Sequence, residues 1–568
     1  MCAVFAITTQ SCTKNFDNLN KNPAQFYSPD PETVFSGAVK NMVETMGNNN
    51  VDRLWEYSHI IYKGNRYTTG DENGSVWQRL YVRVLSNLQQ IKVLYKDNPL
   101  YTNRLQIAEI WQCYTYAYLV AMYGPVPYSQ ALNPDITEIK FDGEAEIYTS
   151  LLSRLKIASD AIKLDGDKFS PDIMYGGDLL KWKKFANSLR LRLALRSQLV
   201  IPEVSAAAIT DIMSNESVLL SAEADNAKVA FGQGDGNESP YFVKLLKNSV
   251  DVNQQPKMSD YVYLYFRSYN DPRLTAFYEP VDEDKRFAVT DTLESTVDDT
   301  IRVVTYKVPY LGSPKSTTLL PAWGLTATSP LSGSTIANFN SLKASILAPG
   351  HPFMVMDYAE VCFMKAEAKY LNLGGSKTAD QYYYEGIDAS FNFWGVGGQV
   401  LSYKAQDGIK WNTEGKGFNN YIGLVNANIP ANNLNKIWIQ RWINYYPDGA
   451  FDLWCLQRRT LVLDLPTHTN PGNPNLNAAF LDLPARWEYP LNEKSYNAAG
   501  YNDAVAKLNG RDFADTFLKF EKTYVHRNWT LAHAAFDGSS LLKWYGTTIQ
   551  DLTNSGIAYK VVSKYKKP

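Results

Sequence analysis

The chain of 568 residues is long enough for several domains or for one large helical domain with insertions. Its composition, 45% hydrophobic and 20% charged, is that of a folded protein and excludes a disordered chain. Lys and Arg number 56 and Asp and Glu number 58, a net charge of -2, so the chain lacks the basic field with which proteins gather nucleic acids.

The first two-thirds of the chain predict a series of helices. Between residues 77 and 95 apolar side chains recur at three- and four-residue steps, which indicates a helix with one buried side. A second helix is expected over about 103–123, where Gly124-Pro125 ends it. Two more are expected within 147–162 and 182–196. Consecutive helices of this length favour an antiparallel helical array.

A helix pair is predicted most clearly after residue 357. Small and apolar residues form one stripe over 357–373, and its alanines let a neighbouring helix approach closely. Gly374-Gly375 would end the first helix, and Thr378 with Gln381 forms a capping box for the next. Such hairpins are the unit of tetratricopeptide-type arrays, although no regular repeat is visible.

Three loop-rich zones interrupt the helices, at about 225–350, 395–433 and 464–500. They are rich in Gly, Ser, Thr, Pro and Asn, and residues 302–312 alternate like a short strand. These zones are too polar to form a core, so we expect them to fold over one face of the helices and to carry binding residues. The sequence therefore predicts a mostly all-α domain over 31–568 with tetratricopeptide-like helical pairs, a loop-rich ligand-binding region and minor short strands.

Catalytic and metal-binding patterns are scarce. The five histidines form no H-E-x-x-H pair, and there is no G-x-S-x-G nucleophile elbow or phosphate loop. Residues 165–172 offer several carboxylates without calcium-loop spacing, so we expect no metal and no cofactor, while a calcium ion there stays open. Loop carboxylates such as Asp71 and Glu72 leave a glycan-degrading hydrolase open, because a glycosidase needs only two.

The five cysteines form no C-x-x-C pair, and Cys113, Cys362 and Cys455 are predicted to be small buried hydrophobes. No apolar run is long enough to span a bilayer as a helix. The unusual feature is the aromatic content, with 13 Trp, 38 Tyr and 24 Phe. Tyr and Trp combine an apolar face with a hydrogen-bonding edge, which suits surfaces that bind sugars.

Six stretches, in order, resemble the SusD/RagB family of outer-membrane nutrient-binding lipoproteins, and in particular its SusD-like branch. They are YGPVPYSQAL (123–132), DLLKWKKFANSLRLRLALR (178–196), NDPRL (270–274), the helix pair at 358–370 and 383–396, QRWINYYPDGAFDLWCLQRR (440–459) and ARWEYPLNEKSYN (485–497). In the last of these we expect Arg486 and Tyr489 to pin the C-terminal segment to the scaffold.

The resemblance implies a surface lipoprotein without catalytic activity that caps a SusC-like TonB-dependent transporter. Such a protein passes oligosaccharides, or in some members oligopeptides, into the transporter. Both cargoes stay open, as do a hydrolase and a purely structural scaffold.

Release to a transporter calls for modest affinity, and therefore for a shallow aromatic platform rather than a deep pocket. Loop aromatics and one loop carboxylate are the candidates for ligand binding: Tyr67, Asp71, Trp77, Trp323, Trp411 and Tyr421. Trp77 also begins the apolar stripe described above, so a core position stays open for it.

Small and polar residues lead to Ser11-Cys12, which is similar to a lipoprotein processing site. We expect residues 1–11 to be the remnant of a signal peptide, Cys12 to carry the lipid and residues 12–30 to form a tether to the outer membrane. The first eleven residues contain no Lys or Arg and their apolar core is short. Translation from further upstream and the absence of an anchor both stay open.

Overall fold

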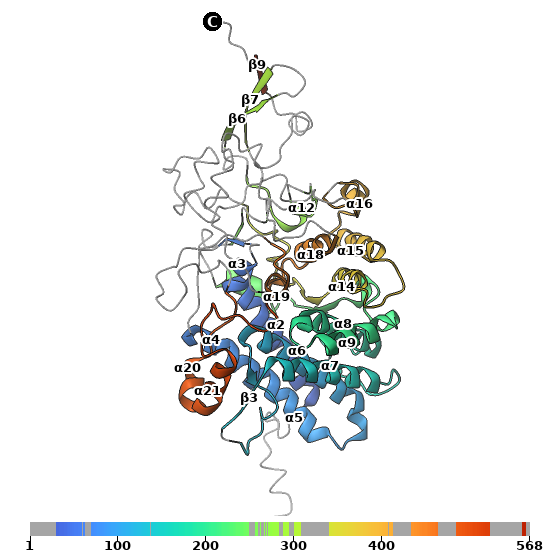
Figure 1. The fold of residues 1–568 in the computed structure, drawn as a ribbon, viewed down its shortest axis with the longest axis vertical. Helices are drawn as coiled ribbons and strands as arrows, with labels where there is room; N and C mark the ends of the chain where they lie inside the picture. Colours follow the sequence, from blue (N-terminus) through green and yellow to red (C-terminus); the bar gives the residue numbers. More distant parts are fainter. Residues whose placement is uncertain are drawn as a thin grey trace, which may run out of the picture.

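The computed structural model describes residues 30–58, 61–62, 70–136, 138–248, 256–259, 271–282, 288–294, 300–307, 340–406, 408–412, 433–463, 484–522 and 559–563, with the single residues 262, 266 and 269. Helices dominate this part of the chain (Figure 1). The expectation of a mostly α-helical fold with minor short strands is confirmed.

The N-terminal helices form one half of the molecule. They are α2 (Pro31–Asn49), α3 (Trp55–Tyr57), α4 (Gly70–Gln78), α5 (Ser86–Tyr95), α6 (Thr102–Tyr123), α7 (Glu144–Ala161), α8 (Leu179–Arg196) and α9 (Pro202–Met213). Two π-helical turns, η1 (Asn50–Leu54) and η2 (Arg79–Leu85), connect α2 to α3 and α4 to α5. Consecutive helices α6, α7, α8 and α9 pack against one another, and α6 is buried on nearly every side. The four helices expected in this region are confirmed.

The second half is built from α14 (Tyr358–Tyr370), α15 (Ala379–Phe393), α16 (Val400–Lys404), α18 (Asn433–Asn444) and α19 (Ala450–Thr460) (Figure 1). α14 and α15 form the predicted hairpin. Gln381 accepts a hydrogen bond from the Thr378 backbone N–H at 3.0 Å, which confirms the capping box. Gly386 of α15 lies against the Phe363 ring, where a Cβ atom would come within 2.6 Å, so the close approach of the two helices requires glycine there.

The described strands are short and pair in small antiparallel sheets. They are β1 (Ile61–Tyr62), β2 (Val126–Pro127), β3 (Phe141–Asp142), β4 (Ala227–Val229), β5 (Lys257–Met258), β6 (Ala288–Glu294), β7 (Thr300–Lys307), β8 (Phe353–Met356) and β9 (Tyr559–Ser563). Their pairing is β1–β5, β2–β3, β4–β8 and β6–β7–β9. The strand expected near 302–312 is confirmed as β7, which pairs with β6 and with the C-terminal β9.

The loop-rich zones contain more helix than the sequence indicates. Besides α16, the structure places α10 (Pro240–Phe242), α12 (Leu274–Phe277) and α20 (Leu491–Tyr496) there, followed by α21 (Ala498–Lys507). Residues 70–76, expected in a loop, belong to α4. These segments become helical because distant segments pack on them, as β3 does on α21 and α4 does on α20. No described helix combines the length and hydropathy that a membrane crossing requires.

Buried ion pairs join the two halves. Arg192 and Arg196 of α8 both bond Asp452 of α19, at 3.1 and 2.5 Å. Arg192 also reaches Glu360 of α14 at 2.8 Å. The side chains of this cluster are at most 6% exposed, so each charge depends on its partners rather than on water.

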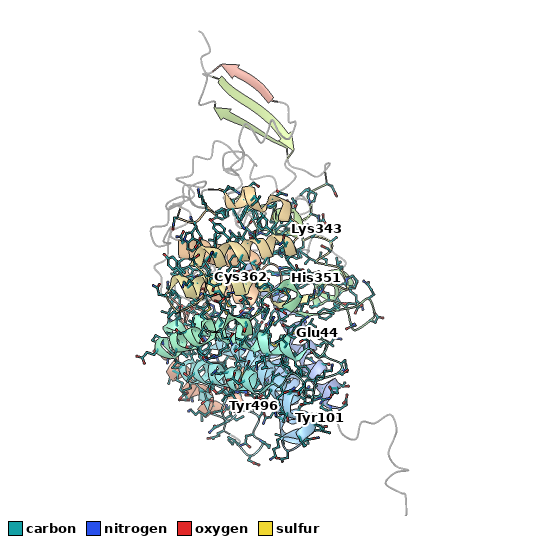
Figure 2. The ribbon with its side chains drawn as sticks, turned by 90° about the vertical axis from the view of Figure 1, so that its right-hand side faces the viewer. Glu44, Tyr101, Lys343, His351, Cys362 and Tyr496 are labelled. Atoms are coloured by element: carbon teal, nitrogen blue, oxygen red, sulfur yellow. The ribbon has the colours of Figure 1, made fainter. Side chains whose placement is uncertain are left out.

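The C-terminal segment 484–522 is bound to the first half through the end of α6. Arg486 donates from Nε to the Tyr123 carbonyl at 3.0 Å, and Tyr489 donates to the Pro125 carbonyl at 2.6 Å. Both side chains are fully buried. They therefore pin this segment to the scaffold, as expected. The three described cysteines Cys113, Cys362 and Cys455 are buried too, and Figure 2 shows Cys362 inside the helical body.

Glu144 at the start of α7 makes this attachment sensitive to pH. Its two carboxylate oxygens accept hydrogen bonds from the Lys519 backbone N–H, and burial raises its pKa to about 7. A carboxyl group with a raised pKa stabilises the fold fully below its unfolded pKa of about 4.3, and this contribution is lost as the pH rises through about 7.

We therefore expect Glu144→Gln, which cannot ionise, to gain stability relative to the wild type as the pH rises from about 4.3 to about 7. Above that range the difference in the free energy of unfolding between Glu144→Gln and the wild type should stay constant. Urea unfolding at a series of pH values measures it, with Glu203→Gln on the exposed side of α9 as the control. Parallel pH profiles for wild type and Glu144→Gln would contradict the assignment.

Candidate functional site

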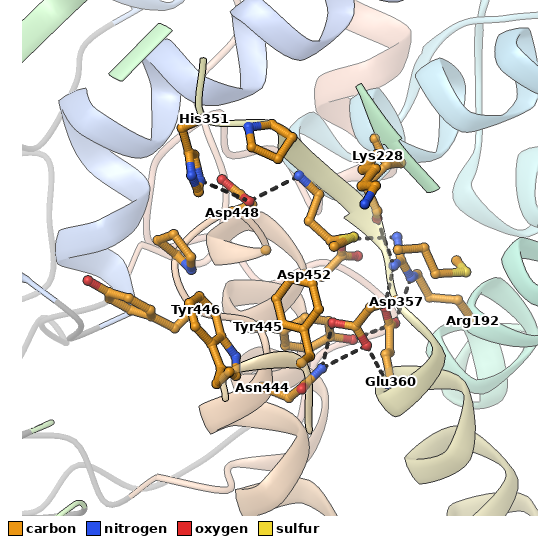
Figure 3. A pocket seen from close by; sticks show the side chains of 18 residues that line it. Arg192, Lys228, His351, Asp357, Glu360, Asn444, Tyr445, Tyr446, Asp448 and Asp452 are labelled. Atoms are coloured by element: carbon orange, nitrogen blue, oxygen red, sulfur yellow. Dashed lines mark hydrogen bonds and ion pairs between the residues drawn. The ribbon is translucent and has the colours of Figure 1, made fainter. Parts of the chain in front are cut away.

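A polar cavity lies between the two halves of the molecule (Figure 3). Arg192, Glu360 and Asn444 line one side, and His351 and Asp448 line the other. Asn444 donates to both oxygens of Asp357 at 2.9 Å. The cavity volume is about 80 Å³, well below the ~300–1,000 Å³ of small-molecule sites. Its charged groups bond one another, so we assign the cavity to the scaffold.

A much larger groove, of about 1130 Å³, lies at the other side of the first half. It is lined from three segments that are far apart in the sequence, namely 74–94 of α4, η2 and α5, residues 127–139 after β2, and residues 490–497 with α20. We call it the α5–α20 groove. Figure 1 shows α20 beside α4 near one end of the molecule, and Figure 2 shows Tyr496 at the same end.

The floor of the groove is aromatic. Trp77 packs on Tyr81 with ring centres 4.9 Å apart and meets Tyr123 edge-on at the same distance. The Tyr81 hydroxyl donates to the Pro127 carbonyl at 2.7 Å, which joins η2 to the end of β2. Trp77 is only 7% exposed, so the groove meets a small part of the indole while the rest belongs to the core.

The side of the α4–η2–α5 helix that faces the groove carries three exposed aliphatic residues. Val82, Val93 and Leu94 are 58%, 56% and 54% exposed, whereas Leu80 and Val84 are fully buried. The π-helical turn η2 lies between α4 and α5 and changes the angular position of the residues that follow it. Two apolar sides therefore coexist on one helix, one in the core and one in the groove.

The rim offers unpaired amides and an aromatic ring. The side chains of Gln78, Gln90 and Asn492 make no hydrogen bond to any residue within the described ranges, so their donors and acceptors are available to a ligand. Tyr496 at the end of α20 is 83% exposed.

Glu493 of α20 is the single carboxyl group in the described lining of the groove. That lining contains no Lys, Arg or His. Burial raises its pKa, while hydrogen bonds from Trp77 and Asn497 act in the opposite direction.

The wall that carries Tyr496 is held rigidly. Asn497 donates from Nδ2 to the Ile139 carbonyl at 2.9 Å. Gly500 lies against the same carbonyl, where a Cβ atom would come within 2.3 Å, so any other residue would push α21 away from the loop. The groove is therefore preformed, with one wall on each side of its aromatic floor.

This arrangement suits an uncharged polyol with apolar faces. Aromatic and aliphatic side chains contact C–H groups, and the amides of the rim exchange hydrogen bonds with hydroxyl or amide groups. A glycosidase needs two carboxyl groups on either side of the bond it breaks, and Glu493 has no carboxylate opposite it in the described lining. The groove is equipped for binding.

The residues predicted to bind ligand do not form one platform in the described structure. Trp77 lies at the floor of the groove. Trp411 lies in the second half, where it packs against Tyr383 with ring centres 5.4 Å apart and donates its backbone N–H to Tyr384 at 2.8 Å. Asp71 lies in α4, although its side chain lies outside the described part. Four further predicted residues lie outside the described residues: Cys12, Tyr67, Trp323 and Tyr421.

Sequence reasoning missed Gln78, Gln90, Asn492, Glu493 and Tyr496. Val82, Val93 and Leu94 offered a signal, because they are apolar residues that fall off the buried stripe of their helix. Tyr496 and Glu493 stand in a stretch that was interpreted as scaffold, and nothing in their sequence neighbourhood distinguishes them.

Two of the three carboxylates in residues 165–172 have structural partners. Asp167 accepts hydrogen bonds from the backbone N–H groups of Asn103 and Arg104, at 2.8 and 3.0 Å, and so caps α6. Asp172 accepts from the Trp182 indole at 2.7 Å. Among the residues that the structure describes, no group of His, Cys, Asp and Glu is arranged to hold a metal ion.

Residues 22–490 match the family model described as SusD-like, starch-binding, associating with the outer membrane. No curated protein matches the chain.

Solved structures share the fold. A SusD homologue from Parabacteroides distasonis has a TM-score of 0.68 at 21% identity, covering 87% of this chain and 97% of its own. A SusD homologue from Bacteroides uniformis has 0.64 at 22%, covering 86% and 99%. A SusD homologue from Flavobacterium johnsoniae, described as chitin-binding, has 0.65 at 21%, covering 86% and 99%.

Proposed function

Because the chain belongs to the SusD-like family, described as starch-binding and associating with the outer membrane, we propose that it binds a glycan at the cell surface and passes it to a SusC-like TonB-dependent transporter without catalysis. The observation that carries the glycan assignment is the α5–α20 groove, with an aromatic floor, an exposed tyrosine and free amides. A lipid on Cys12 would keep the protein at the outer membrane.

The first ligands to test follow from the family and from the groove. The family description points to starch, and the chitin-binding description of the Flavobacterium homologue points to an N-acetylated glycan. Val82, Val93 and Leu94 offer aliphatic contacts for which an acetamido methyl group is suited, beside amides that could bond its carbonyl and N–H.

Calorimetric titration of the full chain with maltohexaose, chitohexaose and a mixed oligopeptide pool tests the proposal. We expect binding of at least one oligosaccharide, with no new reducing ends after long incubation. Binding of peptides alone would move the assignment to the oligopeptide-binding members, and release of new reducing ends would overturn the non-catalytic assignment.

Tyr496→Ala should weaken binding of the glycan. Loss of one stacking ring costs about 1 kcal/mol, which is about fivefold in affinity. The fold should keep its stability because Tyr496 is 83% exposed. Leu401→Ala, which removes a side chain 79% exposed on α16, is the matched control and should leave the affinity unchanged. Equal affinities for wild type and Tyr496→Ala would place the ligand elsewhere.

A further inference from the structure

We propose that the α5–α20 groove selects uncharged oligosaccharides and that Glu493 is the residue that excludes acidic ones. The inference rests on the proposed glycan-binding function and goes beyond it, since it names the substrate class and the side chain that sets it. It starts from the distribution of charge in the described lining, where amides, hydroxyls, aromatic rings and aliphatic groups surround a single carboxylate.

The polar neighbours of the Glu493 carboxyl group are neutral. The indole of Trp77 from the floor and the amide of Asn497 from the wall act on it in the direction that lowers its pKa. It forms no ion pair with any residue in the described ranges. Neutral donors orient the carboxylate but leave its negative charge uncompensated.

Two lysines of the helices that form the groove, Lys494 of α20 and Lys92 of α5, contact other residues. Lys494, the next residue of α20, lies 3.6 Å from Asp512 and over the Tyr501 ring, and it does not line the groove. Lys92 of α5 bonds Glu109 and Gln112 of α6 and is not among the residues that line the groove. Within the described part of the chain, the groove therefore carries the field of a carboxylate that has no cationic partner.

A ligand carboxylate or sulfate that enters the groove meets this charge, and the described lining offers no cation to bind it. At a separation of about 5 Å in a well-hydrated site the repulsion lowers affinity about four- to tenfold per ligand charge. A neutral sugar loses no affinity by charge repulsion, and its hydroxyls can donate hydrogen bonds to the carboxylate. Selectivity of this type comes from a repulsive element against the wrong ligand.

The test compares matched ligands that differ by one kind of group. Maltohexaose and chitohexaose are each titrated beside the same oligosaccharide oxidised at C6 of one sugar residue to the uronic acid, so that the two ligands differ by one charge. For the wild type we expect the oxidised form to bind about four- to tenfold more weakly than its neutral parent. The measured quantity is the ratio of the two dissociation constants, which a general weakening of the site does not change.

Glu493→Gln keeps the shape and the acceptor oxygen of the side chain and removes its charge. For this variant we expect the ratio of the two dissociation constants to be close to one. Glu203→Gln, which removes an exposed charge on α9, should leave the ratio as it is in the wild type. Thermal unfolding of each variant confirms that it is folded before titration.

The outcomes separate the inference from the function on which it rests. If a neutral oligosaccharide binds the wild type and its oxidised form binds equally well, the selectivity is overturned and glycan binding stands. A ratio that persists in Glu493→Gln shows that another group excludes acidic ligands and overturns the role of Glu493. Absence of binding by every oligosaccharide overturns both.

Discussion

Replacing Glu367 by alanine is expected to lower the free energy of unfolding by about 3–5 kcal/mol. Glu367 of α14 is fully buried and accepts hydrogen bonds from Arg459 of α19 at 2.6 and 3.0 Å and from Arg441 of α18 at 3.1 Å. Alanine leaves the buried Arg459 without the carboxylate it bonds and takes from Arg441 one of its two, the other being Glu360 at 3.4 Å. A guanidinium group cannot become neutral by releasing its proton, so the unfavourable energy of the buried charge lowers the free energy of unfolding.

Urea unfolding measures this loss, with Asp503→Ala as the matched control. Asp503 pairs with Lys507 within α21 at 2.6 Å, but its side chain is 45% exposed, so its loss should cost less than about 1 kcal/mol. Similar losses in the two variants would show that the buried cluster does not hold α14, α18 and α19 together.

Trp182→Ala is expected to cost a similar amount, about 3–5 kcal/mol, for a different reason. The indole is fully buried on α8 and lies among Phe35 of α2, Trp111 of α6 and Tyr175, with ring centres 5.5–6.3 Å away. Its Nε1 donates to Asp172 at 2.7 Å. Alanine would leave a cavity where three segments meet and a buried carboxylate without one of its donors.

Leu180 provides the control on the same helix, because it lies two residues away and is 46% exposed. Leu180→Ala should change the free energy of unfolding by about 0.5 kcal/mol or less. Trp182→Phe should lie between the two, because it retains the ring contacts and loses the bond to Asp172. A cost for Trp182→Ala close to that of Leu180→Ala would contradict the packing described around α8.

The helices could be predicted because their signals are local. The stripe from Trp77 to Tyr95, the Gly124 stop and the Thr378 capping box each involve residues within a few turns of one another. α20 was missed because the contacts that fix it come from far away, through Ile139 and Asp512. Its own six residues carry too little periodicity to indicate a helix.

The groove could not be predicted for a related reason. Its walls come from three segments separated by tens to hundreds of residues, and no single segment is unusual. Trp77 shows the limit most clearly, since its core position is confirmed while its role in ligand binding stays a prediction. The ring is 7% exposed and packs in the core, yet it also lies at the floor of the groove.

Hydrogen–deuterium exchange of the full chain, with and without the oligosaccharide that binds in calorimetry, locates the binding surface most directly. Binding in the α5–α20 groove predicts slower exchange in residues 74–94 and 490–497 when ligand is present. The helix pair α14–α15 should exchange at the same rate in both samples. Saturating ligand that leaves residues 74–94 and 490–497 unchanged, with protection appearing elsewhere, would contradict the assignment of the groove as the glycan site.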